Sequence, residues 1–158
     1  MTSLLILPLL LAVHVLSVIL WIGGLAFVTT VVLPALARLP AARRIPAFLE
    51  IERRFGLQAR VLVLVAGASG ADMMARLHLA GPLGTAHGLW LDGMIAFWAL
   101  FMLLLFVLEP AVLHRRLRER GTRDGEATRV RLLRGHAVLL VLALIVVTAA
   151  VFGVQGVG

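Results

Sequence analysis

Residues 4–33 read LLILPLLLAVHVLSVILWIGGLAFVTTVVL, an apolar stretch without a single charged side chain. A helix needs about 20 mainly apolar residues to cross the roughly 30 Å hydrocarbon core of a bilayer. The stretch is therefore long enough to span a membrane, and it lacks the basic start of a signal peptide. We expect it to be retained as the first membrane helix, with His14 deep inside it.

Further apolar stretches follow at residues 57–79, 89–113 and 134–154, and an amphipathic cytoplasmic segment at 47–60 is expected to lead into the second span. The chain is 61% hydrophobic with a mean hydropathy of +1.04, far above the roughly 45–50% apolar content of soluble domains. The short connectors predict one all-α transmembrane domain, residues 1–158. We expect a four-helix bundle with an up-down-up-down order.

The 15 basic residues are all arginines, and they fall mainly in two connectors, residues 38–60 and 115–134. Cytoplasmic loops of membrane proteins carry such an excess of positive charge. This pattern places both termini on the non-cytoplasmic side and indicates a multi-pass protein of the bacterial inner (plasma) membrane. The expected partners are the bilayer and its anionic lipid headgroups, whereas a nucleic-acid partner is not expected because no folded basic domain is left.

The absence of cysteine excludes disulfides and thiolate metal sites, so the histidines are the main candidates for cofactor chemistry. These are His14, His78, His87, His114 and His136. An ionisable residue at the depth of His14 is a functional-site hypothesis by default, although hydrogen bonding to a facing carbonyl or to Ser17 would also explain it. Neutral imidazole is the commonest metal ligand.

Two histidine pairs can be drawn, because residues equidistant from a turn lie level in an antiparallel hairpin. His14 and His78 have their midpoint at Pro46, and His114 and His136 have theirs at Gly125. Level histidines on neighbouring helices suit the two axial positions of a b-type haem. Helical spacing in the second span places Leu64, Gly67, Ala71, Met74 and His78 on one face, which we expect to point inward.

Other polar residues permit different interpretations. Met73, Met74 and Met94 lie near His78 and His87, and thioether and imidazole ligands suit Cu(I). Ordinary packing explains the methionines equally well. Asp72 and Arg76 are spaced to form an ion pair on one helix, while Glu109 is expected to pair with Arg60 or Arg54, with a proton-relay role as an alternative.

Several segments resemble a known family. They are the run from His14 through Trp21 to Gly23 and Gly24, residues 90–94, residues 106–115, and the run from Leu133 through His136. They resemble the copper resistance protein D family, whose larger members have eight helices and are described as copper carriers. The fold this implies is similar to membrane b-type cytochromes and to the four-helix haem-binding protoporphyrinogen oxidase.

By this resemblance, His14, His114 and His136 are the expected metal ligands, while His78 and His87 are alternatives for the remaining ligand of a two-haem scheme. The leading expectation is a protein that binds one or two haems b and transfers electrons, with quinone as a partner. Such a protein could act as a membrane haem oxidoreductase. The alternatives are a copper-handling protein and a cofactor-free membrane subunit. A homo-oligomer is a further expectation, and no catalytic residue is indicated.

Overall fold

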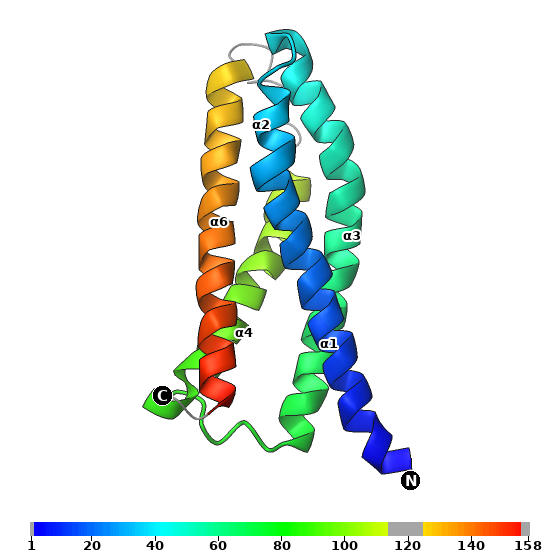
Figure 1. The fold of residues 1–158 in the computed structure, drawn as a ribbon, viewed down its shortest axis with the longest axis vertical. Coiled ribbons are helices and arrows are strands. Elements are labelled where there is room, and N and C mark those ends of the chain that lie inside the picture. The colour runs from blue at the N-terminus through cyan, green and yellow to red at the C-terminus, as the bar shows by residue number, and fades with distance from the viewer. Residues whose placement is uncertain (1, 114–124, 156–158) are drawn as a thin grey trace.

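The computed structural model describes residues 2–113 and 125–155, and the regular elements in this part of the chain are all helical. A first rod consists of α1 (Thr2–Phe27), the π-helix η1 (Val28–Val32) and α2 (Leu33–Leu36). It is followed by α3 (Ala41–Arg76), the short 3-10 helix η2 (Ala86–Gly88), α4 (Leu89–Leu103) with the π-helix η3 (Leu104–Leu113), and α6 (Gly125–Val154). The long helices run side by side, and α1 begins and α6 ends at the lower end of the view in Figure 1.

Four helical stretches are long and apolar enough to cross a membrane, judged by length and composition. The candidate spans are Leu5–Leu36, Ala41–Arg76, Ala86–Glu109 and Glu126–Val154. Large hydrophobic side chains such as Leu9, Leu16 and Val141 are more than half exposed on the outside of the bundle. Apolar side chains pointing away from the core are what lipid contact requires, so the chain is a multi-pass membrane protein.

The centre of the bundle is a cluster to which all four rods contribute. Its buried members are Trp21, Leu25, Ala59, Val63, Phe97, Phe101 and Ala143. The Trp21 ring stacks on Phe97 at 5.7 Å and meets Phe101 edge-on at 4.7 Å between centroids. A second cluster joins η1 and α2 to the start of α3, with Phe48 and Leu33 fully buried in it.

Small residues let aromatic rings lie against the helix backbone, as expected where helices pack in lipid. A Cβ on Gly24 would lie 2.2 Å from the Phe55 ring, and one on Gly67 would lie 2.5 Å from the Trp98 indole nitrogen. The Trp98 indole N–H donates to the Val63 carbonyl at 2.9 Å. The indole therefore covers α3 along a full turn and ties α4 to it.

The first turn differs from the one expected around Pro46. The chain turns at residues 37–40, and Pro46 lies inside α3, which runs unbroken through the segment expected at residues 47–60. Pro46 has no N–H and therefore leaves the Ala42 carbonyl without its helical donor. This is tolerated because both residues are exposed near the start of the helix.

The inward face of α3 also differs from the expectation. The buried side carries Gly56, Ala59, Val63, Ala66 and Ser69. Of the residues expected there, Leu64, Ala71 and His78 are exposed, while Met74 and Gly67, which packs against Trp98, are half-buried. The two sets are offset by about one residue, which is a rotation of roughly 100° around the helix. Small residues occur on both sides of α3, so their spacing alone does not select the packed one.

Candidate functional site

His14 lies at the interface between α1 and α3, next to the small residues of α3. Its Nδ1 is 2.9 Å from the Ala66 carbonyl oxygen and 3.2 Å from Ser69 Oγ. A Cβ built on Gly70 would lie 3.1 Å from His14 Cε1, so this glycine makes room for the ring. The Ser17 hydroxyl instead donates to the Val13 carbonyl at 2.7 Å and is not the partner of His14.

The bond to Ala66 decides where the imidazole proton lies. A carbonyl oxygen only accepts, so His14 Nδ1 must carry the hydrogen, and Nε2 of the neutral ring then holds a lone pair. Metal-ligating histidines have the same arrangement, with the second ring nitrogen donating to a carbonyl or carboxylate. His14 is therefore oriented and protonated as an Nε2 ligand would be.

The predicted pairing of His14 with His78 is wrong. His14 contacts α3 at Ala66 to Gly70, whereas His78 lies beyond the helix end at Arg76, exposed and with a backbone φ of 52°. The reason is the turn: with its centre near residue 39 instead of 46, the residue level with position 14 is near 64 instead of 78. His87 is also exposed, in η2.

His136 occupies a separate level of the bundle. Its Nδ1 is 2.9 Å from the Leu132 carbonyl of its own helix, and its ring meets Phe48 edge-on at 5.9 Å. Phe48 and Ala66 are 18 residues apart on α3, which corresponds to about 27 Å along a helix. His14 and His136 therefore cannot share one ligand, and His114, the expected partner of His136, lies outside the described residues.

The space around these histidines limits what they could hold. Within the described residues, 2–113 and 125–155, no three His, Asp or Glu side chains lie close enough together to hold a metal ion. The middle of the bundle is filled by the Trp21, Phe97 and Phe101 rings. The donor chemistry of His14 fits a haem iron or a copper ion, but the described residues place no second histidine beside it.

A buried ion pair links α3 to η3. Arg60 Nη2 donates to Glu109 Oε1 at 2.8 Å, and the Glu109 side chain is only 5% exposed. Arg60 Nε also donates to the Leu105 carbonyl at 3.1 Å. The expectation that Glu109 pairs with Arg60 or Arg54 is thus confirmed for Arg60, because Arg54 instead pairs with Glu50 on the exposed side of α3.

Glu52 joins this pair and was not singled out by its sequence position. Its carboxyl group lies beside that of Glu109, because both groups lie close to the backbone of Gly56. A signal was present in the sequence, since Glu52, Gly56 and Arg60 are spaced four apart and share one face of a helix. That face packs against η3.

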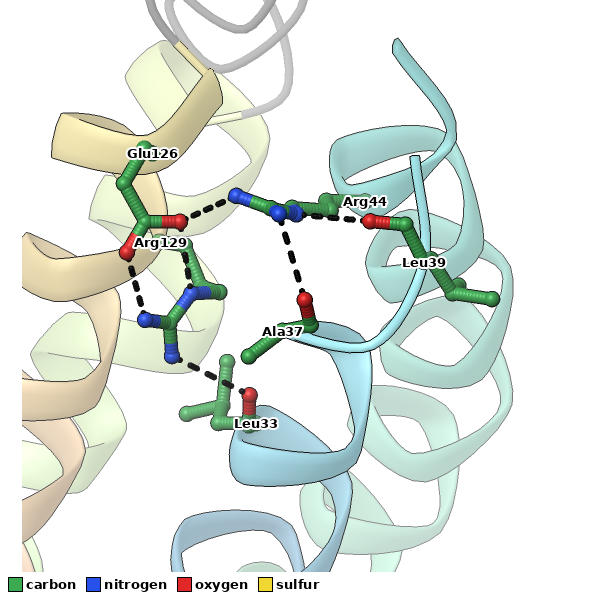
Figure 2. A network of polar contacts seen from close by, with 6 residues as sticks. All are labelled: Leu33, Ala37, Leu39, Arg44, Glu126 and Arg129. Atoms are coloured by element: carbon green, nitrogen blue, oxygen red, sulfur yellow. Dashed lines mark hydrogen bonds and ion pairs between the residues drawn. The ribbon is translucent and has the colours of Figure 1, made fainter. Parts of the chain in front are cut away.

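Two further arginines hold the helices together at the end of the bundle that contains the first turn, as Figure 2 shows. Glu126 at the start of α6 binds Arg129 at 2.6 Å and also pairs with Arg44 of α3. The two guanidinium groups also donate to carbonyls around the first turn, those of Leu33, Ala37 and Leu39. Leu33 begins α2, whereas Ala37 and Leu39 lie in the connector after it. The arginines thus supply donors to carbonyls where the first rod ends.

Asp72 and Asp92 have structural roles near the opposite end of the bundle. Asp72 pairs with Arg76 at 3.0 Å, as its spacing predicted. Asp92 accepts a hydrogen bond at 3.0 Å from the backbone N–H of Gly84, which has a φ of 73°. The connector before η2 is thereby fixed to α4.

Comparison with known proteins yields no relative. No family model matches the chain, and no curated protein or solved structure gives a significant match.

Proposed function

We propose that this multi-pass membrane protein binds haem b through His14 and transfers electrons between a membrane quinol and an acceptor. The observation that carries the proposal is the hydrogen bond between His14 Nδ1 and the Ala66 carbonyl at 2.9 Å. It supports an Nε2 lone pair held at a fixed angle inside an apolar span, which is what an axial iron ligand needs. Bound haem would supply one-electron redox chemistry, and the chain's own residues would hold and orient it.

His14 is the first ligand in this proposal, and His136 with His114 would form a second, separate site near the arginine-rich end. The level pairing with His78 is not part of the proposal, because the geometry separates the two residues. Arginines near His136, such as Arg131 and Arg134, are exposed. They would neutralise acidic groups of a cofactor or of lipid at that end.

The proposed orientation puts the arginine-rich end of the bundle in the cytoplasm of a bacterial cell, with an up-down-up-down order and both termini outside. Arg38, Arg43, Arg53 and Arg54 are exposed at that end, and positive charge is retained on the cytoplasmic side. Anionic headgroups are the proposed lipid partners of these side chains. A quinol partner and a homo-oligomer belong to the same proposal.

Absorption spectroscopy of the detergent-purified protein tests the cofactor. We expect a Soret band and an α band that sharpens on reduction, and we expect His14→Ala to lose at least one haem while its helix content is unchanged. His87→Ala is the matched control, because His87 is exposed, and it should keep the wild-type spectrum. A colourless protein that binds copper stoichiometrically would instead favour the copper-handling alternative.

A further inference from the structure

Three ionisable side chains meet inside the bundle where α3 crosses η3. Glu52 and Arg60 come from α3, and Glu109 comes from the end of the third span. Arg60 donates to Glu109 and to the Leu105 carbonyl, and the Glu52 carboxyl group lies beside that of Glu109. Glu109 thus lies between one cation and a second acid.

Gly56 allows the two acids to approach each other. A Cβ at this position would lie 3.2 Å from Glu109 Oε1 and 3.5 Å from Glu52 Oε1. Both carboxyl groups therefore lie over the same bare stretch of helix backbone. A side chain on Gly56 would occupy the place where they meet.

Charge balance determines how many protons this group holds. With both acids ionised, two negative charges would face the single positive charge of Arg60 in an apolar interior, which is strongly disfavoured. The next charged residues on α3 do not compensate, because Arg53 and Arg54 are 68% and 79% exposed and both pair with Glu50. The described charged residues of α6 nearest the first turn, Glu126 and Arg129, are bound to each other.

The closeness of the two acids over Gly56 leads to the same count. Two ionised carboxylates repel each other and only accept hydrogen bonds, so their close approach in this interior favours a proton on one of them. Glu109 has the direct ion pair with Arg60 at 2.8 Å and is the acid that stays ionised. Glu52 is then the donor.

We propose that Glu52 and Glu109 form a proton-binding site, in which one exchangeable proton resides on Glu52 and Arg60 balances the charge of Glu109. Protonation of the Glu52 carboxylate makes the group neutral and supplies the donor to Glu109. Loss of that proton leaves one uncompensated negative charge, and both acids then compete for Arg60. Glu52 is half-buried near the arginine-rich end, so the proton exchanges with the water on that side of the membrane. The proposal does not depend on a bound cofactor.

Infrared spectroscopy of the purified full-length protein tests this directly, because a protonated carboxyl group has a carbonyl stretching band that ionised carboxylates lack. We expect the band in wild-type protein at neutral pH, a shift of the band in D₂O, and its reversible loss as pH is raised. Glu52→Gln should remove the band and keep the fold, since the amide can donate the same hydrogen bond. Glu50→Gln, which alters an exposed acid only two residues away, should retain it.

Chemical labelling gives a second readout. Dicyclohexylcarbodiimide modifies protonated carboxyl groups in apolar surroundings, so peptide mass mapping should find its adduct at Glu52 and should lose it in Glu52→Gln. Wild-type protein without the infrared band at neutral pH would overturn the proposal. So would a band that survives in Glu52→Gln, or one that does not respond to pH in protein that remains folded.

Discussion

Arg60 donates from Nε to the backbone carbonyl of Leu105 at 3.1 Å, across the interface between α3 and η3. In a π-helix the intrahelical partner of this carbonyl would be the N–H of the residue five positions on, which is Pro110. Proline has no N–H, so the carbonyl would be left without a donor in an apolar interior. The same guanidinium thus satisfies the backbone of η3 and neutralises Glu109.

We expect Arg60→Ala to lower the free energy of unfolding by about 3–5 kcal/mol, because it leaves a buried carboxylate without its cation. Arg76→Ala is the matched control: it breaks an exposed pair with Asp72, and such pairs contribute about 0–1 kcal/mol. Denaturation of both variants in detergent measures the difference, and equal losses would contradict the structural role of Arg60.

The glycine beneath the two acids should be equally sensitive. Gly56→Ala places a methyl group 3.2 Å from Glu109 Oε1, and we expect a loss of about 1–3 kcal/mol, as for other overpacked interiors. Gly23→Ala is the control, because a Cβ there meets nothing within 4 Å. It should be neutral or stabilising by up to about 1 kcal/mol, since alanine favours helix over glycine. Thermal unfolding midpoints distinguish the two, and a neutral Gly56→Ala would contradict the close approach of the carboxyl groups.

The number and placement of the spans could be predicted from the sequence, because about 20 apolar residues in a row have few other stable arrangements. The pairing of Asp72 with Arg76 followed from spacing within one helix, and that of Glu109 with Arg60 followed from the charged residues expected at the same end of the second and third spans. These predictions needed no knowledge of how the helices are rotated. They are confirmed by the ion pairs at 3.0 Å and 2.8 Å.

The pairing of His14 with His78 was wrong because it depended on where the chain turns between the first two spans. Three prolines lie near the first connector, and the sequence does not show that Pro40 precedes the helix while Pro46 lies inside it. Moving the turn centre by about seven residues, from 46 to about 39, moves the residue level with His14 by about 14 positions, from 78 to about 64. The π-helices were also missed, because a local change in hydrogen-bond register leaves the apolar pattern of a membrane span unchanged.

The last prediction concerns orientation in the membrane. Fourteen of the 15 arginines lie in residues 38–60 and 115–134, and retention of positive charge on the cytoplasmic side predicts that the first turn lies inside the cell. The chain has no cysteine, so single cysteines can be introduced at Ala42, exposed near the start of α3, and at Thr85, exposed before η2. In intact cells an impermeant maleimide should label Thr85→Cys and leave Ala42→Cys unlabelled.

Permeabilised cells supply the control for this experiment, because both cysteines are exposed on the protein and both should react once the reagent enters. The cysteine-free wild type should remain unlabelled under either condition. If Ala42→Cys reacts in intact cells and Thr85→Cys does not, the bundle has the opposite orientation. The arginines would then face outward, and the proton on Glu52 would exchange with the outside of the cell.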